Sequence, residues 1–292
     1  MNPDFSYTIC TDTGADMPWG SLKQQQIEIA HLHYKMNGAA YAYDLGRETD
    51  LSAFYFAMRN GAEVGTIPVL PEAFRALWEP HLIEGRDVLY ISISRHLSKT
   101  FLAAQHAREE LIARYPTRRI VVVDSLCCSV AQGMLVFEAS YMRHEGKTMD
   151  EVASWVVRNR QYVNALLLPQ DLKWLREAGL YQGGAMGELL GRKTLLRMDA
   201  TGRPALEARA KDDAEALQAV VDSVKRMGYA LNSQVVAVTH ADAPDIAAQL
   251  QDALCAAGCG DASVLPMGPI VGCYAGPGAV GVAFFGSRRE QN

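Results

Sequence analysis

The sequence contains no run of about 20 apolar residues, the length that a helix needs to cross a bilayer. It also contains no sustained run of lysine and arginine, and its 28 basic and 33 acidic side chains give a formal net charge of −5. Binding through phosphate charge, as in nucleic acids or anionic bilayers, is therefore not expected. The N-terminus, Met1-Asn2-Pro3-Asp4, lacks the basic and apolar regions of a signal peptide. We expect a soluble cytoplasmic protein without stable membrane insertion.

Several catalytic signatures are missing as well: there is no GxSxG, no HExxH, no Walker loop and no CxxC pair. The six cysteines are irregularly spaced, which in a chain of 292 residues predicts buried free thiols and not a disulfide framework. Cys127 and Cys128 are adjacent, and Cys255 and Cys259 lie one helical turn apart, so either pair has a spacing suited to oxidation or metal binding. Because no histidines converge on them, we expect neither a metal nor a cofactor.

Two further patterns resemble known sites only in part. Residues 276–281 match GxGxxG, but only eleven residues follow and they are typical of a strand, so we predict a backbone turn and not a dinucleotide site. His31 and His33 alternate on a predicted strand and would face the same side, a geometry that can bind zinc. No third ligand stands at a recognisable spacing, and we predict that both lie on the solvent face of an edge strand.

The sequence does contain apolar, β-branched runs that alternate with helical patterns almost from end to end. This alternation predicts an α/β protein with a largely parallel sheet. The predicted strands are 7–11, 27–34, 88–93, 120–123, 163–168, 235–239 and 282–285, and the predicted helices are 52–60, 71–83, 98–114, 129–145, 149–160, 212–227 and 243–257.

The chain is long enough for two domains. A glycine-rich, less regular segment between residues 180 and 204 follows the dense alternation of the first half. We therefore place the domain boundary near Tyr162 and predict an N-terminal α/β domain over residues 1–162 and a C-terminal α/β domain over residues 163–292.

Hydroxyl side chains gather where the predicted strand 88–93 gives way to a helix. Ser98 and Thr100 fall in the first turn of that helix, where unpaired N–H groups and a partial positive charge suit a carboxylate or a phosphate. The alternative is that Ser98 only caps the helix.

Six segments, in order along the chain, resemble the DegV family, whose members bind fatty acids and in some bacteria serve as the acyl-carrying subunit of fatty acid kinase. In the first half of the chain, residues 11–18 (TDTGADMP) are similar to the family pattern TDSxADLP, residues 65–71 (GTIPVLP) to TSQPSP, and residues 97–101 (LSKTF) to LSGTY. Residues 123–125 (VDS, followed by Ser129 and Gly133) resemble the DS segment that opens the next helix. In the second half, residues 186–194 (MGELLGRKT) are similar to LGxLLxIKP and residues 274–279 (YAGPGA) to HTGPGA.

The resemblance implies a two-domain α/β fold with a long acyl chain in a tunnel between the domains and its carboxylate held by hydroxyls. Carried over by position, Thr66 and Ser98 are the carboxylate donors, and Ser94 and Thr100 lie close behind them. The segment similar to HTGPGA adds Tyr274 and Gly276 to the ligand site. Lys211, or alternatively Arg209, stands near the place of the arginine in the family's KxRG.

The sequence departs from the family at positions that bear on charge. Tyr274 replaces the family histidine, and no KxRG is recognisable, so poor support for a fatty acid kinase catalytic subunit is expected. Lys99 and Arg95 replace a glycine and a serine and add positive charge at the head-group end, which suits a bulkier or more anionic ligand. The leading hypothesis is a non-enzymatic carrier of a long-chain fatty acid. The alternative is an enzyme that acts on a small anionic metabolite at the same cleft.

Overall fold

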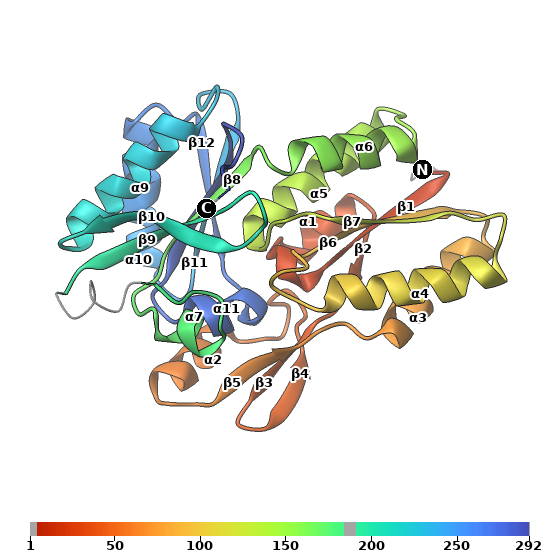
Figure 1. Cartoon of the computed structure of the whole chain (residues 1–292), viewed down its shortest axis with the longest axis horizontal. Coiled ribbons are helices and arrows are strands. Elements are labelled where there is room, and N and C mark those ends of the chain that lie inside the picture. The colour runs from red at the N-terminus through yellow and green to blue at the C-terminus, as the bar shows by residue number, and fades with distance from the viewer. Residues whose placement is uncertain (1–4, 184–190, 292) are drawn as a thin grey trace.

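The computed structural model describes residues 5–183 and 191–291, and two sheets with their helices lie side by side (Figure 1). The first sheet has the order β2-β1-β6-β7, and all its neighbouring strands are parallel. We call it the parallel sheet; its strands are β1 (Tyr7–Asp12), β2 (Ile27–Ala30), β6 (Asp87–Ser92) and β7 (Ile120–Asp124). Their nearly continuous apolar runs are typical of strands that helices cover on both faces.

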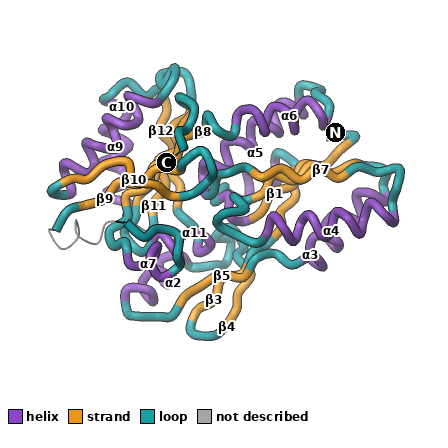
Figure 2. Tube along the Cα trace, in the orientation of Figure 1, coloured by secondary structure: helices purple, strands orange, loops and turns teal. Residues whose placement is uncertain are grey.

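Helices do cover both faces of the parallel sheet, as Figure 2 shows. On one face, Phe74, Trp78 and Leu111 pack with Tyr90 of β6. On the other face, Leu135 and Val152 belong to a separate apolar cluster that includes Leu89 of β6. The helices of this region are α1 (Trp19–Gln24), α3 (Pro71–Ile83), α4 (Thr100–Arg114), α5 (Ser129–His144) and α6 (Met149–Asn159). These layers confirm the α/β prediction.

The predicted strand 27–34 is divided into two strands that belong to different sheets. Leu32 lies in the break, and its N–H donates to the hydroxyl of Thr13 over 3.0 Å instead of to a neighbouring strand. The second piece joins a small antiparallel sheet of order β4-β3-β5, made of β3 (His33–Met36), β4 (Ala39–Ala42) and β5 (Val64–Ile67). The helix α2 (Leu51–Arg59), capped by Asp50, lies between β4 and β5 in the chain.

The edge-strand prediction for the two histidines is wrong. His33 begins β3, the middle strand of the small sheet, and His31 lies between two strands with its Nδ1 2.7 Å from the carbonyl oxygen of Tyr43. Among the described residues, no group of three or more His, Cys, Asp and Glu side chains is arranged to hold a metal ion.

A six-stranded sheet of order β10-β9-β8-β13-β11-β12, here called the mixed sheet, forms the second half of the chain. Of its strand pairs only β11–β12 is parallel, so a fully parallel sheet is found in the first half and a mainly antiparallel one in the second. Its strands are β8 (Val163–Leu168), β9 (Lys193–Met198), β10 (Pro204–Ala210), β11 (Val235–His240), β12 (Asp261–Pro266) and β13 (Val280–Phe285). Of the segment 186–194, residues 186–190 lie outside the described part of the chain, and Lys193 and Thr194 begin β9.

The mixed sheet has one face covered by α9 (Asp213–Met227) and α10 (Pro244–Ala256), where Val224 and Leu250 pack in its core cluster. The other face turns toward α5, which contacts strands of both large sheets. Two short helices, α7 (Lys173–Glu177) and α11 (Pro269–Ala275), pack against each other beside the small sheet. The division into domains at residues 162 and 163 stays a prediction.

The cysteines are all free: four are buried, Cys128 is half-buried, and Cys255 is exposed. The prediction of free thiols is thus confirmed, although one of them faces solvent. Across residues 5–183 and 191–291, no helix combines the length and the apolar character that crossing a membrane requires.

Candidate functional site

A cavity lies between the mixed sheet and the loops at the carboxyl edge of the parallel sheet. The space between protein atoms in this region is about 890 Å³ in total, a figure that includes open solvent at its mouth. Both halves of the chain line it, Leu32, Ile93 and Val130 from the first half and Leu167 and Ile270 from the second. Aliphatic side chains dominate the lining, so the space suits an apolar molecule.

The wall on the mixed sheet is built from cross-strand rows. One row runs through Leu196, Leu167 and Gly281 to Thr239, and all four residues line the cavity. A second row pairs Ala165 with Ala283, which line it as well. Directly opposed residues in a sheet point to the same face. The short side chains of Ala165 and Ala283 leave room for an apolar molecule against this face. Gly281 instead allows close packing, since a Cβ on it would lie 3.0 Å from Cγ2 of Thr239.

One part of the cavity lining is polar because Thr66 and Tyr274 meet there. Thr66 comes from β5 and Tyr274 from α11, and their hydroxyls form a hydrogen bond. Burial raises the pKa of Tyr274, an effect that the bond from Thr66 only partly offsets, so the phenol remains protonated. Each hydroxyl carries one hydrogen, and their mutual bond uses one of the two. One hydrogen of this pair is therefore left to donate to a ligand.

Ser98 supplies a second polar group to the lining, and its hydroxyl lies 2.9 Å from that of Thr100. The Ser98 oxygen also accepts a hydrogen bond from the N–H of Thr100, and the Thr100 oxygen accepts one from the N–H of Val69. This pair, too, uses only one of its two hydroxyl hydrogens internally. Thr100 itself is fully buried behind Ser98 as the first residue of α4. The N-cap of α4 is Lys99, so Ser98 stabilises the helix start from one residue earlier, and this role is compatible with ligand binding.

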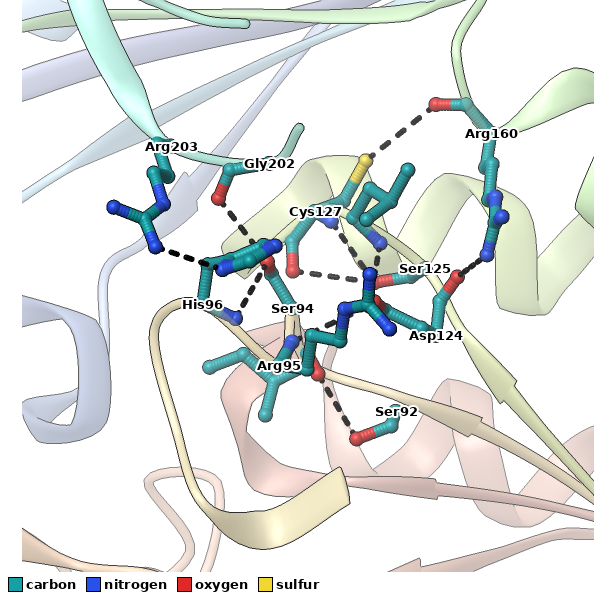
Figure 3. Close-up of polar contacts among 12 residues, drawn as sticks. Ser92, Ser94, Arg95, His96, Asp124, Ser125, Cys127, Arg160, Gly202 and Arg203 are labelled. Atoms are coloured by element: carbon teal, nitrogen blue, oxygen red, sulfur yellow. Dashed lines mark hydrogen bonds and ion pairs between the residues drawn. The ribbon is translucent and has the colours of Figure 1, made fainter. Parts of the chain in front are cut away.

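Ser94 is fully buried and is not among the residues that line the cavity. Its hydroxyl donates to the carbonyl oxygen of Gly202 over 3.1 Å and so ties the loop after β6 to the turn between β9 and β10 (Figure 3). Beside it, a guanidinium nitrogen of Arg203 lies 3.1 Å from Nδ1 of His96. Ser94 therefore belongs to a seam between the two halves of the chain.

Arg95 lies on the same loop and pairs with a carboxylate outside the cavity. Its Nε lies 3.4 Å from Oδ2 of Asp124 (Figure 3). Its side chain is 58% exposed and is not part of the cavity lining. The positive charge of Arg95 is thus directed to Asp124 in this structure, not to the cavity.

Gly276 directly follows α11 with a φ of 80°, and a Cβ placed on it would lie 2.2 Å from Cδ1 of Trp174. The predicted backbone turn is therefore confirmed for residues 276–279, with α11 before it and β13 after it, while the last two residues of the pattern already belong to β13. Lys211 lies elsewhere, at the start of α9, with a side chain that is 77% exposed and 4.0 Å from Glu215. Arg209 is exposed on β10. The structure brings neither Lys211 nor Arg209 into the cavity lining.

Comparisons with known proteins agree with this architecture. The profile of the family described as "Uncharacterised protein, DegV family" matches residues 6–287. The chain belongs to the DegV family. A DegV domain-containing protein of Clostridium perfringens is 28% identical over 287 residues, which cover 97% of this chain and 99% of that protein.

Solved DegV structures share the fold. A fatty-acid-binding DegV family protein from Thermus thermophilus superposes with a TM-score of 0.85 at 25% identity and covers 96% of this chain and 99% of its own. The fatty acid kinase B3 protein of Streptococcus pneumoniae, loaded with linoleic acid, has a TM-score of 0.82 at 18% identity, with 96% and 99% covered. The two-domain α/β prediction is thereby confirmed.

The DegV motifs mark only part of the cavity. Cys128 and Ser129 line it but follow the VDS segment without an assigned role in the sequence analysis. The small residues Ala165, Gly281 and Ala283 were not predicted to form a wall. The sequence feature that could have indicated this wall is the recurrence of short side chains in strands that are otherwise rich in valine and leucine.

Proposed function

We propose that this protein binds one long-chain fatty acid in the cavity between the sheets and acts as a non-catalytic carrier. The observation that carries the proposal is a mostly aliphatic cavity whose lining includes the hydroxyls of Thr66, Ser98 and Tyr274. An acyl tail requires the first feature and a carboxylate the second. The fatty acids named for the related DegV structures support the same ligand class.

The fatty acid carboxylate accepts hydrogen bonds from the Thr66–Tyr274 pair and from Ser98 in this proposal. Each pair of hydroxyls has one hydrogen to spare, and hydrogen bonds to an ionised carboxylate are each worth about 1.5–3 kcal/mol. Thr100 supports Ser98 from behind, and Gly276 shapes the turn that follows Tyr274. Ser94 and Lys211 are left without direct ligand contacts.

Mass spectrometry of the natively purified protein after organic extraction tests the proposal. A buried acyl chain co-purifies with its carrier, so we expect one fatty acid per chain in the extract. The matched control is the same preparation after delipidation on a hydrophobic resin, which should release none. A small anionic metabolite in place of a fatty acid would favour the alternative, an enzyme that acts at the same cavity.

The same site bears on partnership with a fatty acid kinase catalytic subunit. Phosphoryl transfer depends on charge stabilisation near the reacting oxygens. Tyr274 brings a protonated phenol and no positive charge to the proposed carboxylate site. We therefore expect poor acyl phosphate formation with such a subunit and an increase on Tyr274→His. Robust acyl phosphate production by the unaltered chain, measured with radiolabelled ATP, would contradict this expectation.

A further inference from the structure

Asp16 is a buried carboxylate that links three parts of the molecule. It follows the short 3-10 helix η1 (Thr13–Ala15) with a left-handed backbone (φ 50°) and is only 4% exposed. One carboxylate oxygen accepts from the hydroxyl of Ser129 over 2.6 Å, and the other accepts from the N–H of Gly268 over 2.9 Å. The two partners come from opposite halves of the chain.

Both partners of Asp16 stand next to cavity residues. Ser129 is the first residue of α5, has a strained left-handed φ of 51°, and lines the cavity together with Val130. Gly268 directly precedes α11, whose later residues include Ile270 and Tyr274 in the lining. A displacement of the amino end of α11 would therefore move the Tyr274 hydroxyl relative to Thr66.

We propose that Asp16 is a positioning residue for the ligand site, holding the start of α5 and the start of α11 together so that Tyr274 and Ser129 face the cavity correctly. This inference rests on the proposed function. It assigns Asp16 no contact with the ligand, since Asp16 is not part of the cavity lining.

Burial is the strongest influence on the Asp16 carboxylate. Burial raises the pKa of Asp16 to about 7, the bonds from Ser129 and Gly268 lower it, and the charge of Asp12 raises it. Tyr43, Tyr55 and Cys128 also lie close enough for Asp16 to raise the pKa of each. A neutral acceptor of the same shape should therefore replace the carboxylate without loss of its two bonds.

Asp12 offers a matched control on the same segment. It is fully buried, as Asp16 nearly is, and its carboxylate accepts from the hydroxyl of Tyr90 (2.6 Å) and from the N–H groups of Ile93 and Gly14 (both 2.9 Å). All three partners belong to the first half of the chain. Asp12 thus has the same chemistry as Asp16 and also supports a residue of the lining, Ile93, but it has no bond to α11.

The test compares Asp16→Ala, Asp16→Asn and Asp12→Ala by calorimetric titration with hexadecanoate at pH 8, with the melting temperature measured for each. Asp16→Ala removes both bonds and so displaces Tyr274; it should weaken binding by about tenfold, the effect of losing one hydrogen bond between the ligand and the Tyr274 hydroxyl. Asp16→Asn should restore affinity to within about threefold, because its amide can accept from Gly268 and donate to Ser129. Asp12→Ala should lower the melting temperature and leave affinity within the same margin.

A measurement on the unaltered protein does not depend on the variants folding. The amide signals of Gly268 and Tyr274, followed by NMR, should shift together with a midpoint near pH 7 and remain constant in Asp16→Asn. Unchanged affinity in Asp16→Ala, equal weakening in Asp12→Ala, or a pH-dependent shift of the Gly268 amide without one of Tyr274 would each overturn the inference. Failure of the unaltered protein to bind hexadecanoate would instead refute the proposed function.

Discussion

The polar part of the cavity lining and its apolar wall are built in different ways. The wall lies on one face of a single sheet, where opposed residues of β9, β8 and β13 form rows that strand pairing dictates. The polar part is assembled from a short strand, a loop and a seven-residue helix, and its Thr66 and Tyr274 stand 208 positions apart in the chain. The wall therefore depends on regular secondary structure, whereas the polar part depends on tertiary packing.

The largest expected effect follows from filling the wall. Ala165→Phe places a ring in the space proposed for the acyl tail, and we expect it to weaken hexadecanoate binding by at least about a hundredfold. Ala214→Phe makes the same change at an exposed position of α9 and should leave affinity unaltered. Calorimetric titration measures both, and similar affinities for the two variants would show that the tail lies elsewhere.

An intermediate effect is expected from removing hydroxyls at the polar part. Thr66→Val and Ser98→Ala should each weaken binding by about ten- to a hundredfold. Ser98→Ala removes a charge-assisted hydrogen bond, and Thr66→Val removes either such a bond or the one that orients the Tyr274 hydroxyl. Ser98→Ala should also lower the free energy of unfolding by about 1 kcal/mol, since Ser98 accepts from the first N–H of α4. Lost stability with unchanged affinity would leave Ser98 as a helix cap only.

The smallest effect on affinity, but a clear effect on stability, is expected from neutralising Asp16. Its pKa is raised to about 7 in the folded protein and returns to the usual value near 4 on unfolding. Between these values the folded chain holds a proton that the unfolded chain has lost, so the free energy of unfolding falls as the pH rises. From pH 5 to pH 8 this contribution amounts to roughly 3 kcal/mol.

Asp16→Asn removes that contribution. Chemical denaturation at several pH values should therefore show that stability falls less steeply with rising pH in Asp16→Asn than in the unaltered protein. Parallel pH profiles for the two proteins would mean that Asp16 is ionised at its ordinary pKa and is better hydrated than its burial indicates.

The contrast between the apolar wall and the polar part also explains which elements could be predicted from the sequence. Periodicity and strand composition predicted α3 and β8 with the bounds that the structure has, and most other long elements to within two residues. The strands β4, β5, β9, β10 and β12 were not predicted. Of these, β10 contains an irregularity between Leu206 and Ala208, and β12 is an edge strand of mixed polarity. Helix α11 was missed because seven residues that include proline and glycine give no helical period.

The site was predictable only where a motif marks it. Family resemblance placed Thr66, Ser98 and Tyr274 together, and periodicity alone would not have done so, since contacts between distant segments leave no local pattern. The same resemblance suggested Lys211, which the structure leaves exposed outside the cavity. The roles of Ala165 and Gly281 depend on what surrounds them in three dimensions, which local sequence does not reveal.

Calorimetric titration of the delipidated protein with hexadecanoate and with octanoate tests most directly whether the cavity is an acyl-chain site. Each additional buried methylene contributes about 0.8 kcal/mol before association costs, so the eight extra carbons of hexadecanoate add roughly 6 kcal/mol of gross burial. We predict a submicromolar dissociation constant for hexadecanoate and much weaker binding of octanoate. Equal affinities for the two acids would contradict the proposal that the aliphatic cavity holds the tail.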